Sequence, residues 1–172
     1  LDHARGDQGV RGHLDGVVQA EIQAWEYPAQ RFDLVISRLA LHYIADLAAV
    51  LHKIFRTLKP GGRLVFSVEH PVITSCDRAW ESGVRQDWIV DDYFSTGVRK
   101  TEWMNGQVVK YHRTIEDYFQ ETLAAGFTVD ALREGQPQRE LFADEDLYRR
   151  RLRIPLFLFL RARKPVSNLQ GA

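Results

Sequence analysis

Apolar and polar positions in residues 31–71 follow the pattern of a strand, a helix, a sharp break and a second strand. Phe32–Ser37 and Arg63–Val68 are short apolar runs rich in branched residues, which is typical of strands buried on both faces. Between these runs, apolar residues recur with the spacing of one helix face, at positions 47, 50, 51, 54, 55 and 58. We therefore expect this helix to lie against the sheet that the two strands form.

The ends of this helix are also marked in the sequence. Asp46 is a suitable N-cap, and Lys59–Gly62 combines a proline with two glycines, which end a helix. Two strands joined by a helical crossover should be parallel, with a right-handed connection. Ligands bind at the carboxyl ends of strands in open parallel sheets, so we expect functional residues in the loops after Ile36 and Val68.

Turn and capping signals divide the rest of the chain into shorter elements. Asn105-Gly106 predicts a tight hairpin turn, because both central positions of such a turn need positive φ. Thr114 is expected to cap a helix, with Asp117 three residues later, and Gly126 to end it. The other predicted elements are the end of a helix at Leu1–Arg5, strands at Val17–Ile22, Phe127–Leu132 and Ile154–Ala162, hairpin strands at Glu102–Met104 and Gln107–Tyr111, and a short helix near Asp144–Arg151.

Composition narrows the class of protein. A chain of 172 residues fits one domain, and its 23 basic and 23 acidic residues give a formal net charge of +0. This balance gives no electrostatic reason to expect binding to nucleic acid or to an anionic membrane surface. The apolar run Leu156–Leu160 is too short to cross a bilayer. The single cysteine, Cys76, excludes an internal disulfide and fits a reducing compartment, so we expect a cytoplasmic protein.

The connection between Pro71 and His112 is richer in aromatic residues than an ordinary loop. A lid of aromatic side chains over a substrate site would exclude water and hold a flat or apolar molecule. The alternative is a small hydrophobic cluster under a long loop, and the two can coexist. The residues expected to face a substrate are Trp80, Trp88, Trp103 and, at the end of the hairpin, His112, for which a surface position is the alternative.

Two segments together resemble a known family. FDLVISRLALHYI, residues 32–44, followed by LKPGGRLVFSVEHP, residues 58–71, is similar to the second half of a class I S-adenosylmethionine-dependent methyltransferase. The closest resemblance is to the small-molecule methyltransferases grouped with the ubiquinone and menaquinone C-methylases, the methyltransferase type 11 group. It extends from about Leu1 to Lys164 and implies an α/β, Rossmann-like three-layer sandwich. The family's sheet order is 3-2-1-4-5-7-6, with strand seven antiparallel, and Val17–Ile22 would be strand three.

The resemblance also implies that the first part of the domain is missing. The family's glycine-rich turn after strand one and the acidic end of strand two are not found here. Leu1–Gly9 superficially resembles such a turn, but only roughly 20 residues separate it from Arg31, too few for the elements that must intervene. We therefore expect an N-terminally truncated domain over residues 1–164, with a lid at 71–112 and a tail at 165–172. Residues before about Pro28 should be detached, mispaired or poorly ordered relative to the remaining sheet, and strand four should have an unpaired edge.

The resemblance implies a cofactor site made of two groups of residues. An acidic residue after strand three accepts a hydrogen bond from the adenine amino group in this family, which corresponds to Glu21, and its neighbour Ile22 packs on the ring. The turn after strand four, Ser37, Arg38 and Leu39, approaches the methionine part of S-adenosylmethionine. The alternatives are a solvated acid at Glu21, a surface cation at Arg38 and simple packing at Leu39.

Three residues are candidates for proton transfer. His42 occurs near the methyl donor in the resemblance, and Glu69 and His70 follow strand five. Structural roles are the alternative for each. A zinc site made from these residues and His112 is disfavoured because the sequence holds no compact ligand motif.

The expected function is transfer of a methyl group from S-adenosylmethionine to a small molecule. One alternative is a non-catalytic fragment, or a degenerate methyltransferase-like module, that cannot bind the cofactor alone. Another is a nucleotide-dependent reductase, which the absence of a G-x-G-x-x-G motif disfavours. The sequence does not indicate the acceptor atom or the oligomeric state.

Overall fold

The structure is a computed structural model that describes residues 16–76, 88–103 and 106–166 of the 172-residue chain. Its main element is a four-stranded sheet with the order β1-β2-β6-β5. The strands are β1 (Phe32–Arg38), β2 (Leu58–Glu69), β5 (Thr128–Glu134) and β6 (Phe157–Arg163). This arrangement confirms the predicted neighbours, since strands four, five, seven and six of the family order occur in that sequence.

Strand directions also agree with the prediction. β1 runs parallel to β2, with Ile36 beside Val65, and β6 runs antiparallel to both β2 and β5. The parallel pair requires a crossover connection, which α1 (Leu47–Thr57) supplies. The antiparallel strand β6 enters between two strands that precede it in the chain, as expected for the last strand of this fold.

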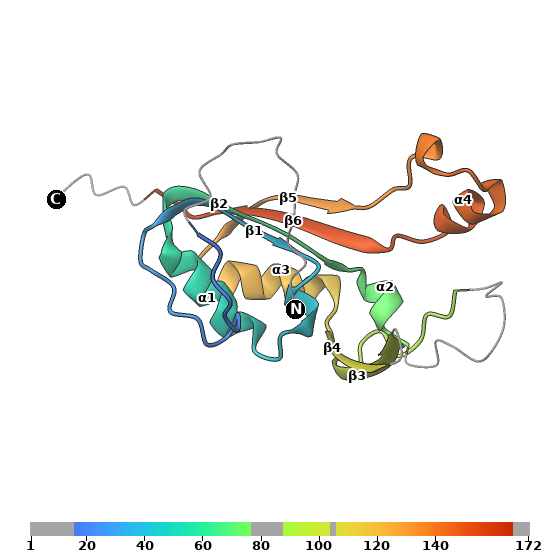
Figure 1. Cartoon of the computed structure of the whole chain (residues 1–172), viewed down its shortest axis with the longest axis horizontal. Coiled ribbons are helices and arrows are strands. Elements are labelled where there is room, and N and C mark those ends of the chain that lie inside the picture. Colours follow the sequence, from blue (N-terminus) through green and yellow to red (C-terminus); the bar gives the residue numbers. More distant parts are fainter. Residues whose placement is uncertain (1–15, 77–87, 104–105, 167–172) are drawn as a thin grey trace.

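Two helices cover one face of the sheet, α1 and α3 (Ile115–Ala124) (Figure 1). Their apolar faces meet the inward side chains of the central strands, so this layer holds the buried core. Asp46 caps α1 as predicted, accepting a hydrogen bond of 2.9 Å from the amide of Ala49. The fully buried members from these elements include Leu47, Val50, Leu51, Ile54, Leu64, Phe66, Val68, Leu158 and Leu160.

One boundary differs from the prediction. Leu58 was expected to be the last apolar residue of the helix, but α1 ends at Thr57 and β2 begins at Leu58. Lys59–Gly62 therefore forms the first part of a long strand after the helix has ended. Leu58 is still fully buried and belongs to the hydrophobic core.

Helix α3 has the predicted start and end. The hydroxyl of Thr114 accepts a hydrogen bond from the amide of Asp117, and the Asp117 carboxylate accepts one from the amide of Thr114, which completes a capping box. After the helix, Gly126 has φ of +99°, and a Cβ atom at this position would lie 3.0 Å from the ring of Phe55. Glycine is therefore required both by the backbone conformation and by the approach of α1.

The opposite face of the sheet is open in the described part of the chain. Leu34 and Ile36 of β1 and Phe157 and Phe159 of β6 are all exposed, and Ile36 has 68% of its surface accessible. The expectation that Phe32–Ser37 is buried on both faces is therefore wrong for the described residues. β1 also pairs only with β2 among the described strands, so the predicted unpaired edge is present.

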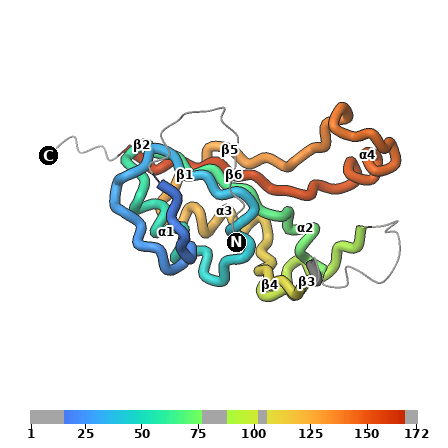
Figure 2. The backbone as a smooth tube through the Cα atoms, in the orientation of Figure 1, coloured from blue at the N-terminus to red at the C-terminus, as the bar shows by residue number. Residues whose placement is uncertain are grey.

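The predicted strand at Val17–Ile22 is wrong. Gly16–Ala20 has no regular structure, and residues 21–24 form a turn. Residues 16–28 lie outside the sheet as expected, yet they are held against α1 (Figure 2): the carbonyl oxygen of Gln23 accepts a hydrogen bond of 2.5 Å from Lys53, and that of Pro28 accepts one from Thr57. A strand here has no neighbouring strand to pair with, which explains the loss of regular structure. The predicted helix end at Leu1–Arg5 lies outside the described residues.

A second sheet is formed by the predicted hairpin. β3 (Gly97–Trp103) pairs antiparallel with β4 (Gly106–His112). The last described pair is Trp103 and Gly106, so Gly106 belongs to β4, and the other residue of the predicted turn, Asn105, lies outside the described residues. The hairpin lies near α2 (Pro71–Thr74), at the end of the main sheet where β2 finishes (Figure 1).

The remaining elements are short. They are the 3-10 helices η1 (Leu41–Tyr43) and η2 (Arg139–Leu141) and the helix α4 (Glu145–Arg151), which confirms the predicted short helix near Asp144–Arg151 and is capped by Asp144. No helix within the described ranges has the length and apolar character needed to cross a bilayer.

Candidate functional site

The carboxyl ends of β1 and β2 lie side by side, and the turn after β1 is hydrogen-bonded to β2. Leu39 adopts φ of +51°, a left-handed conformation that is unusual for a leucine. Its amide donates hydrogen bonds to the carbonyl oxygen of Ser67, at 2.9 Å, and to the Ser67 hydroxyl, at 3.2 Å. These contacts hold the chain in a tight turn directly after the strand, so the predicted cofactor residues Ser37, Arg38 and Leu39 have a defined backbone.

His42, in η1, follows Leu39 of this turn by three residues. The side chain is only 1% exposed, and its Nδ1 accepts a hydrogen bond of 3.3 Å from the amide of Glu69. Its Nε2 is buried and has no hydrogen-bond partner among the described residues. Burial lowers the pKa of His42 to about 4, with Glu69 opposing this shift and Lys110 adding to it. The ring is therefore neutral near pH 7.

Glu69, at the end of β2, is held by a residue that sequence reasoning missed. Lys110 of β4 places its Nζ 2.7 and 2.8 Å from the two carboxylate oxygens of Glu69. The same ammonium lies 6.0 Å from the ring centre of Tyr43. Lys110 precedes His112 by two residues on one strand, so both side chains lie on the same face of the hairpin. The two-residue period of the strand is the signal that could have identified Lys110, because His112 on the same face is predicted to face a substrate.

His70 has a structural role in the described chain. Its Nδ1 accepts a hydrogen bond from the amide of Val72, which caps α2, and its Nε2 lies 2.9 Å from a carboxylate oxygen of Glu134 on β5. Since Nδ1 accepts from an amide, Nε2 must donate to the carboxylate. Both ring nitrogens are thereby occupied, and burial lowers the pKa of His70 although Glu134 raises it.

His112 is similarly occupied at both nitrogens. Its Nε2 lies 2.9 Å from the carbonyl oxygen of Tyr93, so it donates there, and its Nδ1 lies 2.7 Å from the hydroxyl of Thr74. The ring joins the hairpin to α2 and to the segment before β3. The four candidate zinc ligands therefore do not form one set, since the nitrogens of His70 and His112 bind separate protein groups.

The predicted aromatic lid is only partly described. Trp88 donates a hydrogen bond of 3.3 Å to the carbonyl oxygen of Arg150, and its ring lies 5.1 Å from the Arg150 guanidinium. This position is against α4. Trp80 and the side chain of Trp103 lie outside the described part of the structure, so their substrate-facing role stays a prediction.

The structure does not bring the two predicted groups of cofactor residues together. Ile22 lines a cavity of about 770 Å³ with Phe32 and Lys59. Phe32 begins β1, whereas the turn at Leu39 follows the end of that strand. Ile22 and its neighbour Glu21 therefore lie near the amino end of β1, away from the turn at its carboxyl end. The role of Glu21 and Ile22 in cofactor binding stays a prediction of the resemblance.

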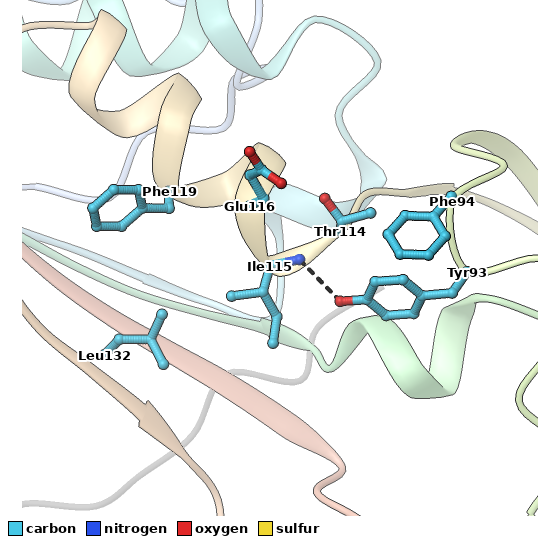
Figure 3. Close-up of a pocket in the computed structure, with 7 residues that line it drawn as sticks. All are labelled: Tyr93, Phe94, Thr114, Ile115, Glu116, Phe119 and Leu132. Atoms are coloured by element: carbon cyan, nitrogen blue, oxygen red, sulfur yellow. Dashed lines mark hydrogen bonds between the residues drawn. The ribbon is translucent and has the colours of Figure 1, made fainter.

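A second cavity lies beside the start of α3. It has a volume of about 430 Å³ and an opening lined by aromatic and aliphatic side chains from three parts of the chain (Figure 3). The hydroxyl of Tyr93 accepts a hydrogen bond of 3.2 Å from the amide of Ile115, which fixes the segment before β3 to the helix start. The lining residues are Tyr93, Phe94, Thr114, Ile115, Glu116, Phe119 and Leu132.

Comparison with solved structures gives close matches over most of the chain. An S-adenosylmethionine-dependent methyltransferase from Mesorhizobium loti is 34% identical, with a TM-score of 0.75 over 84% of this chain and 67% of that one. A protein from Listeria monocytogenes, described under the same family name, is 33% identical, with a TM-score of 0.74 over 86% of this chain and 68% of that one.

Sequence comparisons point to the same family. Residues 1–66 match a family model described as a methyltransferase domain. The ubiquinone/menaquinone biosynthesis C-methyltransferase UbiE of Serratia proteamaculans is 32% identical over 77 residues, which cover 44% of this chain and 30% of that protein. The chain spans between 30% and 56% of the length of the first curated relatives that it matches. Fold, strand order and these similarities together show that the chain belongs to the class I S-adenosylmethionine-dependent methyltransferases.

Proposed function

We propose that this protein transfers a methyl group from S-adenosylmethionine to a small organic molecule. The main support is the turn after β1, whose backbone is held by hydrogen bonds from Leu39 to Ser67. The similar proteins of known structure are described as S-adenosylmethionine-dependent methyltransferases. The cofactor supplies a methyl carbon bound to a positively charged sulfur, which is already a reactive electrophile.

The residues that would hold this cofactor fit the task. The turn of Ser37, Arg38 and Leu39 lies at the carboxyl end of a parallel strand, where ligands bind in open α/β sheets. The Ser37 hydroxyl is buried and without a hydrogen-bond partner in the described chain, so it is available to a ligand. The backbone of the turn is fixed by two hydrogen bonds to Ser67, which lowers the cost of ordering the site when a ligand binds.

Glu69 is the best placed of the three predicted residues to accept a proton. His70 uses both ring nitrogens for protein contacts, and His42 uses Nδ1 for the amide of Glu69. Glu69 keeps further lone pairs on its carboxylate oxygens, and its side chain is 20% exposed. Orientation of the reactants can supply much of the rate in such a displacement, so a base is needed only where the acceptor must lose a proton.

Binding of S-adenosylhomocysteine, measured by isothermal titration calorimetry, tests the proposal. We expect binding to the protein, and transfer of a radioactive methyl group from S-adenosylmethionine to a component of a small-molecule extract. Absence of binding at ligand concentrations up to about 1 mM would contradict the proposal, because substrates are bound at or below this level by most enzymes.

Two substitutions at one position provide a matched control. In Leu39→Pro the backbone N–H that donates to Ser67 is lost, and proline cannot adopt φ of +51°. In Leu39→Gly the N–H is kept, and glycine readily adopts this φ. We expect the proline variant to lose binding of S-adenosylhomocysteine and the glycine variant to retain it. Titration of the 172-residue chain itself addresses the alternative of a non-catalytic fragment, which the matches to methyltransferases do not favour.

A further inference from the structure

We propose that His42 acts as a hydrogen-bond donor, through Nε2, to a negatively charged oxygen of a bound reactant, and does not act as a proton acceptor. This inference rests on the proposed methyl transfer and assigns the role of one residue within it. It replaces the expectation from sequence that His42 is a general base.

The hydrogen bond at Nδ1 determines which nitrogen carries the proton. The amide of Glu69 can only donate, so Nδ1 must present its lone pair to it. A neutral imidazole has one N–H group, and it must then be at Nε2. Nε2 consequently has no lone pair in the ring plane with which to take up a proton from an acceptor molecule.

The surroundings of His42 keep the ring in this form. The titratable and charged groups around it are Glu69, Lys110 and Tyr43, whose ring centre lies 4.2 Å from that of His42. Burial disfavours the imidazolium and outweighs the Glu69 carboxylate, which favours it, while the Lys110 ammonium bound to that carboxylate acts against the imidazolium as well. The site therefore presents one buried, uncharged N–H donor beside a lysine.

An unpaired N–H group in such a position points to a ligand. Nε2 is buried, the whole side chain is 1% exposed, and no described residue accepts from it. Buried polar groups in folded proteins nearly always have a partner, because an unmet hydrogen bond is costly. His42 also follows the Ser37–Leu39 turn by only three residues, and the Ser37 hydroxyl in this segment has no described partner either.

The chemistry of the partner follows from the donor and its neighbour. An uncharged N–H donor bonds most strongly to an oxygen that carries negative charge, such as a carboxylate, phenolate or enolate, and the positive charge of Lys110 acts on His42 as well. Two sources can supply this oxygen: the carboxylate in the methionine part of the cofactor, or an oxygen of the methyl acceptor. Both make the same contact, and binding measurements distinguish them.

The first test is the tautomer of His42 in the unmodified protein, read from imidazole nitrogen signals by NMR. We expect the Nε2–H form, unchanged from about pH 5.5 to about pH 8. An Nδ1–H form or an imidazolium in this range would overturn the proposal. This measurement needs no ligand, so its failure is separate from failure of the proposed function.

The second test compares H42Q, which places an amide N–H near the Nε2 position, with H42A. If the partner is the cofactor carboxylate, H42A should weaken S-adenosylhomocysteine binding at least about tenfold and H42Q should restore it. Binding of 5′-methylthioadenosine, which lacks the carboxylate, should be unchanged in both. If the partner is on the acceptor, cofactor binding is unchanged in H42A, methyl transfer falls at least about tenfold, and H42Q restores the rate without altering its pH profile.

Two results of the second test would overturn the proposal. One is an H42Q protein as impaired as H42A, because a general base is lost equally in both. The other is an H42A protein with normal binding and normal transfer. Circular dichroism and the unfolding midpoint of each variant establish that it is folded.

Discussion

Lys110 binds both carboxylate oxygens of Glu69, at 2.7 and 2.8 Å, and so joins the β3–β4 hairpin to the end of the main sheet. The two residues are far apart in the chain and belong to different sheets. Both side chains are mostly buried, at 9% and 20% exposed. Breaking a pair of this kind leaves a partly buried charge without its partner, which is costly.

Lys110→Met is therefore expected to reduce the free energy of unfolding by about 1–3 kcal/mol, a value between those for buried and exposed ion pairs. Urea denaturation followed by circular dichroism measures this change. Lys59→Met is the matched control, because Lys59 pairs with Asp33 at 2.8 Å but both side chains are well exposed. It should change the free energy of unfolding by less than about 0.5 kcal/mol. Equal losses of unfolding free energy in the two variants would show that the Glu69–Lys110 pair stabilises the protein no more than the exposed Asp33–Lys59 pair.

Stability should fall on acidification because His42 is buried in its neutral form. Its pKa is lowered to about 4 in the folded protein, so the unfolded chain takes up a proton below about pH 6.5 while the folded protein does not. The contribution is fully present above the unfolded pKa and is lost as pH falls toward the folded pKa. The pKa of His70 is also lowered by burial, which acts in the same direction.

The loss that His42 causes between about pH 7.5 and about pH 4.5 should be on the order of 2–3 kcal/mol in the free energy of unfolding. Denaturant titrations of the unmodified protein and of His42→Gln at both pH values measure it as the difference between their pH dependences. A variant with the same pH dependence as the unmodified protein would contradict the burial of a neutral His42.

Gly126→Ala should destabilise the protein more than Gly97→Ala. Both glycines have positive φ, at +99° and +122°, so an alanine is strained at either position. Only at Gly126 would the new Cβ also meet a side chain, the ring of Phe55 at 3.0 Å, whereas nothing lies within 4 Å at Gly97. We expect a loss of about 1 kcal/mol at Gly97 and about 2–3 kcal/mol at Gly126 by thermal unfolding.

The two faces of the sheet should respond differently to loss of an apolar side chain. Leu64→Ala removes a fully buried side chain beneath the helices and should cost about 2–5 kcal/mol. Ile36→Ala, on the open face with 68% exposure, should cost less than about 1 kcal/mol in the 172-residue chain. Denaturant unfolding of both variants measures the difference. A large loss for Ile36→Ala in this chain would mean that other residues cover the open face.

Local signals predicted most of the elements correctly. The helix stripe of α1, the capping pair Thr114 and Asp117, and the glycine that ends α3 each depend on neighbours within a few residues. The strand at Val17–Ile22 was predicted on the same kind of local pattern and is absent. A strand requires partners elsewhere in the chain, and an apolar run cannot supply them by itself.

Candidate site residues show the same division. The sequence placed His42 and Glu69 at neighbouring strand ends, because the carboxyl ends of parallel strands meet at one edge. It did not predict that the amide of Glu69 would occupy Nδ1 of His42, or that Lys110 would reach Glu69 from a separate hairpin. It named His70 as a candidate for proton transfer and His112 as facing a substrate, and it did not predict that their Nε2 atoms would lie 2.9 Å from Glu134 and from the carbonyl oxygen of Tyr93.

The α/β class, the order of the strands from β1 onward and the family can be read from the residues, because helix stripes, caps and the two family segments are continuous in the chain. The nitrogen of His42 that carries the proton, and the charge that neutralises Glu69, are fixed by the folded arrangement. Those properties depend on hydrogen bonds between residues 27 and 41 positions apart and on the removal of water around them. No short pattern encodes such contacts, since they exist only when the hairpin and the strand ends are packed together.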